Sequence, residues 1–152
     1  MIDEGESVPE FKANNADGDL VKSSDFKGKK HVIYFYPKDF TPGCTTEADE
    51  FAKNYGQFQK AGIEIIGVSP DDVKSHRKFC DKMGIQFPLL ADTDKKISKA
   101  FGVWGKKKFM GREYMGVMRS TFLVDEKGKI FKVFPKVKPA GHSQQVLESF
   151  NK

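Results

Sequence analysis

The sequence predicts an α/β fold in which a mostly parallel central sheet carries an antiparallel hairpin at one edge and helices on both faces. Two runs, HVIYFY at residues 31–36 and IEIIGV at residues 63–68, are apolar and rich in β-branched or aromatic residues, as is typical of buried strands. A helical pattern lies between them, which makes a β-α-β unit. Further on, two strand-like runs at residues 119–125 and 129–135 flank a Glu-Lys-Gly turn, which is a hairpin signature.

The helix between the first two strands has one apolar face and ends near Gly62. Its apolar residues recur at helical spacing: Ala48, Phe51, Ala52, Tyr55 and Phe58. Residues 69–84 open with Ser-Pro and acidic residues and close on a glycine, which predicts a second helix. Residues 87–92 predict a short third strand, and residues 141–150 predict a closing helix. This order of elements fits a thioredoxin-like architecture.

The stretch at residues 102–116 interrupts this order. Its glycines at 102, 105 and 111 favour turns, so we expect a long loop or a small insertion there. The chain shows no internal repeat, linker or low-complexity segment, and its length fits one domain, residues 1–152.

The composition is that of a soluble globular protein, with 38% hydrophobic and 31% charged residues. No apolar run approaches the length of a membrane span, so we expect no membrane partner. Three of the first six residues are acidic, and this stretch lacks the basic and then apolar order of a signal peptide. We therefore expect a cytoplasmic protein whose thiols rest in the reduced state.

The net charge of +5 comes mainly from lysine, because only Arg77, Arg112 and Arg119 among the 26 Lys and Arg residues are arginines. Lysine scattered along a chain usually solvates a surface, whereas specific binding of nucleic acid recruits arginine or exposed aromatic residues. We therefore expect no nucleic-acid partner.

No motif indicates a metal ion or a cofactor. The histidines His31, His76 and His142 are far apart in sequence, and we expect them at the surface or in strand packing. The chain has no CxxC, HExxH or EF-hand spacing, and no glycine pattern that cradles phosphate. The missing CxxC also argues against a disulfide oxidoreductase.

One of the two cysteines, Cys44, lies at the predicted start of the first helix, in the stretch PKDFTPGCTTE. Thr41 can cap that helix, Pro42 suits its first position, and Gly43 keeps bulk away. Unpaired N–H groups and the positive end of the helix dipole then favour thiolate over thiol. This position suits a nucleophilic cysteine. The alternative is a small buried hydrophobic residue at a helix start.

A helix end does not account for a reactive thiolate by itself. Lowering the pKa of a thiol from ~8.5 to ~6 takes about 3.4 kcal/mol, whereas a helix end supplies at most ~2 kcal/mol. A cation must provide the rest, and Arg119, at the start of the hairpin's first strand, is the leading candidate. The alternative is that Arg119 is a strand-start residue whose charged end reaches solvent.

Pro37, Thr41 and Cys44 reproduce the PxxxTxxC active-site motif of peroxiredoxins, in the form typical of the bacterioferritin comigratory protein, or PrxQ, subfamily. Residues 102–105, residues 114–130 and the closing helix are also similar to that subfamily, so the resemblance covers nearly the whole chain. It implies a thioredoxin-fold peroxidase that reduces hydrogen peroxide and alkyl hydroperoxides without a cofactor. It also implies electrons from thioredoxin or a similar dithiol protein, and a monomer.

The resemblance implies roles for single residues. Cys44 would be the peroxidatic cysteine and become a sulfenic acid, Thr41 would hold the peroxide, and Arg119 would polarise thiolate and substrate. Pro37 would shield the sulfur. Glu47 could orient the arginine, but we favour the interpretation that it is an ordinary first-turn acid.

The resolving thiol departs from the commonest pattern of the subfamily, which places it five residues after the first cysteine, where this chain has Asp49. The second cysteine, Cys80, lies 36 positions after Cys44 on the second predicted helix. A minority of the subfamily resolves from this helix, so we expect Cys80 to trap the sulfenic acid as an intramolecular disulfide, with local unwinding of both helices.

Two alternatives remain open. Cys80 could be core packing in a one-cysteine enzyme that is resolved by an outside thiol. The chain could also be a redox-sensing or chaperone-like protein that is switched by oxidation of Cys44.

Overall fold

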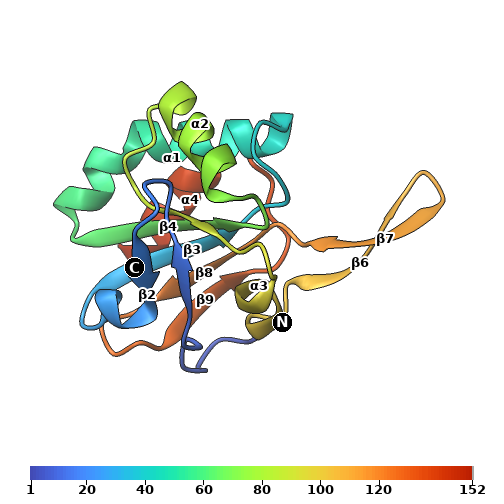
Figure 1. The fold of residues 1–152 in the computed structure, drawn as a ribbon. Coiled ribbons are helices and arrows are strands. Elements are labelled where there is room, and N and C mark those ends of the chain that lie inside the picture. The colour runs from blue at the N-terminus through green and yellow to red at the C-terminus, as the bar shows by residue number, and fades with distance from the viewer. Residues whose placement is uncertain (152) are drawn as a thin grey trace.

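The computed structural model describes residues 1–151 and is built around a five-stranded sheet with the strand order β5-β4-β3-β8-β9 (Figure 1). Three parallel strands make one half of the sheet: β3 (Lys30–Phe35), β4 (Ile63–Ser69) and β5 (Leu89–Ala91). The other half is an antiparallel hairpin that pairs with β3 through its first strand: β8 (Ser120–Val124) and β9 (Ile130–Phe134). The predicted sheet and its edge hairpin are confirmed.

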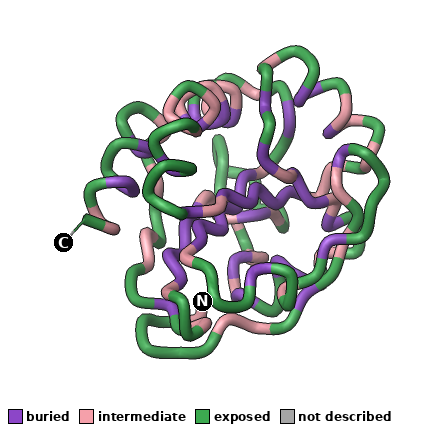
Figure 2. The backbone as a smooth tube through the Cα atoms, turned by 90° about the vertical axis from the view of Figure 1, so that its left-hand side faces the viewer, coloured by how far each residue is buried: buried purple, intermediate pink, exposed green. Residues whose placement is uncertain are grey.

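Both faces of the sheet are covered, as predicted. One face packs against three helices: α1 (Pro42–Lys60), α2 (Val73–Met83) and α4 (His142–Phe150). The other face packs against shorter elements, which were not predicted from the sequence: β1 (Lys12–Asn14), β2 (Leu20–Lys22), η1 (Ser23–Phe26) and α3 (Lys96–Ala100). Figure 2 shows the buried residues gathered along the central strands between these two layers.

Successive side chains of β3 point to opposite faces of the sheet, so this strand contributes to the hydrophobic core on each face. Tyr34 stacks on Phe51 of α1, with ring centroids 4.8 Å apart, and Phe35 points to the opposite face, where its ring lies 5.0 Å from that of Phe101. All four side chains are at most 1% exposed. This packing fixes β3 from both sides, and the segment that carries the peroxiredoxin-like motif begins directly after it.

The predicted helices are present, but α2 begins at Val73, four residues after the predicted start at residue 69, because Ser69 still belongs to β4. Asp72 caps α2 by accepting a hydrogen bond from the Ser75 N–H at 2.8 Å, and Gly84 ends α2 with φ = 68°. Burial of Phe51 and Phe58 confirms the apolar face of α1. Within the described residues, none of the helices is both long and apolar enough to cross a bilayer.

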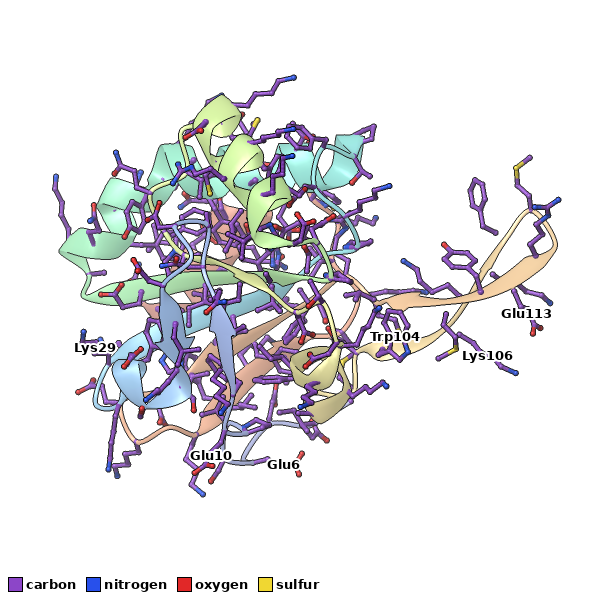
Figure 3. All side chains as sticks on the ribbon, in the orientation of Figure 1. Glu6, Glu10, Lys29, Trp104, Lys106 and Glu113 are labelled. Carbon is purple, nitrogen blue, oxygen red and sulfur yellow. The ribbon has the colours of Figure 1, made fainter. Side chains whose placement is uncertain are left out.

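For residues 102–116 the expectation was a long loop or a small insertion, and the long loop is wrong. This stretch forms a two-stranded antiparallel hairpin, β6 (Trp104–Phe109) and β7 (Arg112–Val117), which projects away from the rest of the fold (Figure 1). Trp104 lies at its base and Glu113 lies far out along it (Figure 3).

The turn of this hairpin consists of Met110 and Gly111, which have φ = 51° and φ = 80°. Two successive residues with positive φ match the type I′ turn, whose twist suits a two-residue hairpin. Phe109 and Met110 are 66% and 89% exposed, so the tip of the hairpin is apolar and open to solvent.

The expectation that the histidines lie at the surface or in strand packing is confirmed for His31, which is buried in β3, and is wrong for His76 and His142. His31, His76 and His142 are 3%, 0% and 2% exposed, and only His31 lies in a strand. His76 lies in α2 and His142 in α4, where each makes hydrogen bonds to other buried polar groups.

Candidate active site

Cys44 is the third residue of α1 and follows the carboxyl end of β3, where open α/β sheets form their sites. Pro42 is the first residue of the helix, and the Thr45 N–H donates to the Thr41 carbonyl at 2.8 Å. The N–H groups of Gly43 and Cys44 therefore precede the first helical hydrogen bond, at the positive end of the dipole. The Cys44 side chain sits at this end and is 1% exposed.

Thr41 is the N-cap residue of α1, as predicted, but its side chain does not cap the helix. Its hydroxyl donates to the Lys38 carbonyl at 2.8 Å instead of accepting from an N–H of the first turn. The start of α1 therefore depends on Pro42, whose fixed φ suits the first helical position and which has no N–H to satisfy.

Arg119 lies between β7 and β8 and joins Cys44 to Glu47. Its Nη2 donates to Cys44 Sγ at 3.1 Å, and its Nη1 donates to Glu47 Oε1 at 2.8 Å. Its side chain is only 17% exposed, so the alternative of an arginine that reaches solvent is wrong. Burial by itself lowers the pKa of Arg119, but the negative charges of Cys44 and Glu47 and its two hydrogen bonds raise that pKa above its ordinary value.

Gly43 leaves the space that this arginine occupies. A Cβ atom at position 43 would lie 3.0 Å from Arg119 Nη2 and 3.4 Å from Pro139 Cγ. The prediction that Gly43 keeps bulk away from the sulfur is confirmed, and the group that needs the space is the guanidinium itself.

Glu47 is 1% exposed, although it is an acidic residue of a helix that starts at the surface. Burial raises the pKa of Glu47 from its ordinary value of 4.5 to about 7, against the attraction of Arg119, which lowers it. Its Oε2 atom has no hydrogen-bond partner among residues 1–151. The interpretation of Glu47 as an ordinary first-turn acid is wrong, because the side chain holds one arm of the arginine that contacts the sulfur.

Cys80 lies on α2, as predicted, and is 5% exposed. Both cysteines are free and belong to the same apolar core between the sheet and α1, α2 and α4. Burial raises the pKa of Cys80 to about 11, although the charge of Arg77 lowers it.

Pro37 is half-buried in the loop between β3 and α1.

Comparison with known proteins decides the family. The family model described as AhpC/TSA family matches residues 5–133. Peroxiredoxin Bcp of Bacillus subtilis (strain 168) is 46% identical over 148 residues, which span 97% of this chain and 94% of that protein. The chain belongs to the peroxiredoxins. It is therefore a thiol-dependent peroxidase, and the family implies a peroxide substrate and a thioredoxin-type reductant.

Solved peroxiredoxins share the whole fold. Xanthomonas campestris peroxiredoxin Q superposes with a TM-score of 0.88 at 42% identity, over 93% of this chain and 89% of that one. A cysteine-to-serine mutant of Xylella fastidiosa PrxQ superposes with a TM-score of 0.94 at 35% identity, over 99% and 96% of the two chains. The thioredoxin-like fold predicted from the sequence is confirmed.

The X. campestris protein also has two solved cysteine-to-serine mutants. Their replaced cysteines lie 36 positions apart in that chain. Cys44 and Cys80 of this peroxiredoxin have the same separation.

Two residues of this peroxiredoxin site were missed or undervalued from the sequence. Glu47 was interpreted as an ordinary first-turn acid, and Lys107 of the β6–β7 hairpin was not considered. The Lys107 Nζ atom donates to the Val117 carbonyl at 3.0 Å, and burial followed by the charge of Arg119 lowers its pKa, while the charge of Cys44 raises it. The charge of Lys107 on the hairpin is thus coupled to those of Arg119 and Cys44, and only the fold reveals this.

Proposed function

We propose that Cys44 is the peroxidatic cysteine and that it reduces hydrogen peroxide and alkyl hydroperoxides. The thiolate attacks the terminal oxygen of the peroxide, an S–O bond forms and the O–O bond breaks. The other oxygen leaves as hydroxide or alkoxide and takes up a proton, and the sulfur becomes a sulfenic acid. X. campestris bacterioferritin comigratory protein, which is 41% identical to this chain, reduces alkyl peroxides, and this supports the substrate class.

The contact of 3.1 Å between Arg119 Nη2 and Cys44 Sγ carries this proposal. A fixed guanidinium stabilises the negative charge on the attacking sulfur, and it remains in place for the oxyanion that leaves. Because Glu47 holds the other arm of the guanidinium at 2.8 Å, the donor is oriented before the peroxide binds.

Thr41 and Pro37 would complete the peroxide pocket. The Thr41 hydroxyl donates to the Lys38 carbonyl, so its oxygen can still accept a hydrogen bond from the O–H of a bound peroxide. Pro37 follows the buried end of β3, where its ring would shield the sulfur from water.

Cys80 would resolve the sulfenic acid. Its sulfur bonds to Cys44 Sγ, the S–O bond breaks, and the oxygen leaves as water with the proton of the Cys80 thiol. A thioredoxin-type dithiol then reduces the disulfide by thiol–disulfide exchange. The cysteine separation shared with the X. campestris mutants supports this role. The two Cα atoms must come within about 4.4–6.8 Å, so we expect parts of α1 and α2 to unwind.

The experiment compares peroxide consumption by wild type, Cys44→Ser and Cys80→Ser, each with thioredoxin and with a small dithiol. Cys44→Ser should lose all activity. Cys80→Ser should lose turnover with thioredoxin but still reduce one equivalent of peroxide. Peptide mass spectrometry after one equivalent should show a Cys44–Cys80 link in the wild type. Activity retained by Cys44→Ser would overturn the peroxidatic role.

A one-cysteine mechanism is the second candidate. The observation in its favour is that burial holds the pKa of the Cys80 thiol at about 11, so this group is not a thiolate at neutral pH in the folded enzyme. An outside thiol would then attack the sulfenic acid. Full turnover of Cys80→Ser with thioredoxin would support this mechanism, whereas a single reaction per wild-type molecule would favour a redox sensor.

We also infer a single domain, residues 1–152, that acts as a monomer in the cytoplasm without a membrane or nucleic-acid partner. The composition supports this inference. Light scattering of the reduced protein tests the monomer, and a salt-sensitive DNA affinity that is independent of both cysteines would contradict the absence of a nucleic-acid partner.

A further inference from the structure

A buried aspartate–histidine contact joins the loop before α1 to α2. Asp39 lies in that loop, and its Oδ2 atom is 2.8 Å from Nδ1 of His76, with side chains that are 1% and 0% exposed. The other ring nitrogen of His76 lies 3.0 Å from the Leu90 carbonyl, an acceptor only, so Nε2 carries a proton. Asp39 also accepts hydrogen bonds from the Tyr36 hydroxyl at 2.7 Å and the Ser75 hydroxyl at 2.8 Å. Both carboxylate oxygens of Asp39 are therefore held by hydrogen bonds, and two of the partners, Ser75 and His76, lie on α2.

The same loop is tied to the end of β4. The Asp39 N–H donates to Asp71 Oδ2 at 2.8 Å, and the Ser69 hydroxyl donates to the same oxygen at 2.6 Å. Asp39, Asp71 and His76 place potential metal-ligating atoms within 4.8 Å of one another, but these atoms are already paired as hydrogen-bond donors and acceptors. We therefore treat the cluster as a hydrogen-bonded junction between the loop, β4 and α2.

Strain lies directly beside this junction. Phe40 has φ = 66°, a left-handed conformation that costs a bulky residue energy and persists only where its surroundings enforce it. Its ring packs edge-on against Phe79 of α2, with centroids 5.1 Å apart, although Phe40 is 46% exposed. Phe79 immediately precedes Cys80, so the loop contacts α2 next to both His76 and the second cysteine.

We propose that the Asp39–His76 pair is a latch that holds the active-site loop on α2, and that its opening sets the rate at which Cys80 reaches oxidised Cys44. The proposal rests on the resolving role proposed for Cys80. Residue 39 lies five positions before Cys44, and residue 76 lies four positions before Cys80. The two cysteines sit on separate helices, and the unwinding that we expect in α1 and α2 would move the preceding loop relative to α2 and stretch the Asp39–His76 contact. The strained Phe40 favours the open state once the contact is lost.

The latch would also set how long the sulfenic acid persists. While the latch is closed, the Cys44 sulfenic acid remains available to a second peroxide molecule, which adds an oxygen to the sulfur to give sulfinic acid and leaves as water or alcohol. A weaker latch should therefore speed disulfide formation and protect Cys44 from overoxidation.

The experiment mixes reduced enzyme with one equivalent of hydrogen peroxide in a single turnover. It separates the oxidation of Cys44 from the formation of the disulfide. Rapid alkylation and peptide mass spectrometry follow the loss of peroxide-reactive Cys44 and the growth of the Cys44–Cys80 link. The variants are Asp39→Asn/His76→Gln, which replaces both members of the buried pair together, and Tyr36→Phe, which removes one donor to Asp39. We expect the rate of disulfide formation to rise about tenfold in the double variant, because loss of the Asp39–His76 contact shifts an opening equilibrium.

Tyr36→Phe should raise the rate of disulfide formation by a smaller factor, and the rate of Cys44 oxidation should stay close to that of the wild type in both variants. Both variants should need more peroxide than the wild type before Cys44 becomes a sulfinic acid. Hydrogen exchange supplies a second readout, since amides of residues 73–83 should exchange faster in both variants than in the wild type.

The matched control is Ile130→Val, which removes one methyl group from a 0% exposed side chain on β9, in the core of the opposite face. It lowers global stability without touching the loop or α2, so its disulfide rate should equal that of the wild type. An unchanged or slower disulfide rate in the folded latch variants would overturn the latch and leave the resolving role of Cys80 intact. Absence of the link in the wild type would overturn the resolving role itself, and the latch with it.

Discussion

The guanidinium of Arg119 donates a hydrogen bond to Cys44 Sγ at 3.1 Å, and the two residues are 75 positions apart in the chain. The pairing of β3 with β8 brings them together, because β3 leads into the helix of Cys44 and β8 begins directly after Arg119. The reactivity proposed for the sulfur therefore depends on a tertiary contact as well as on the helix start.

Replacement of Arg119 should slow the reaction of Cys44 with peroxide. We expect Arg119→Ala to lower the second-order rate constant by about 100-fold or more, because one fixed donor to a developing charge has an effect of that size. The rate constant of Arg119→Lys should lie between those of the wild type and Arg119→Ala, since an ammonium group keeps the charge but lacks the fork that reaches both Cys44 and Glu47. Stopped-flow peroxide consumption measures this. The exposed Arg112→Ala is the control, and equal rates in the control and in Arg119→Ala would contradict the role.

Gly43→Ala should have a similar effect on the rate without removing any functional group. Its Cβ atom would lie 3.0 Å from Arg119 Nη2, so the guanidinium must shift by a few tenths of an ångström from the position in which it contacts the sulfur. Gly56→Ala is the matched control, because it lies in the same helix and its Cβ atom would meet nothing within 4 Å. We expect Gly56→Ala to keep the wild-type rate and to raise the free energy of unfolding by about 0.5–1 kcal/mol. A normal rate in Gly43→Ala would show that the arginine tolerates displacement.

Glu47 should make the stability of the protein depend on pH. Burial raises its pKa from 4.5 to about 7, so the folded state binds this proton more tightly than the unfolded state does. The resulting stabilisation is complete below pH 4.5 and is lost as the pH rises through 7, a change of about 3 kcal/mol. Urea unfolding of wild type and Glu47→Gln across this range should show the wild type losing stability relative to the variant. A difference that does not vary with pH would contradict the raised pKa.

Met110→Asn should stabilise the β6–β7 hairpin. Met110 has φ = 51° before Gly111, and Asn-Gly is the preferred pair for such a turn. We expect a local gain on the order of 1 kcal/mol. Since the hairpin projects from the core, the gain should appear as slower hydrogen exchange in residues 104–117, with little change in the global unfolding midpoint. Faster exchange in the variant would argue against the type I′ turn.

The sequence was sufficient to predict those elements whose signals lie in neighbouring residues. Cys44 could be placed at a helix start because Thr41, Pro42 and Gly43 directly precede it, and the buried strands are continuous apolar runs. The partners of polar residues could not be predicted in this way. Glu47 pairs with a residue 72 positions away and His76 with one 37 positions away, so both were expected to be unremarkable surface or packing residues.

The β6–β7 hairpin was missed for a different reason. Strand prediction from sequence depends on one apolar face, which alternates with a polar face along the chain. Lys106 and Lys108 share a face with Met115 and Glu113, their cross-strand partners, so neither face of this ribbon is uniformly apolar. Its glycines then dominate the pattern and suggest turns.

The projecting ribbon also offers a practical route for labelling the enzyme. The outer ends of β6 and β7 pair with each other, and the exposed Met110–Gly111 turn closes them. A short epitope or a fluorophore-binding peptide inserted at that turn would extend outward from the fold, so the protein can be tagged there without disturbing either of its two cores.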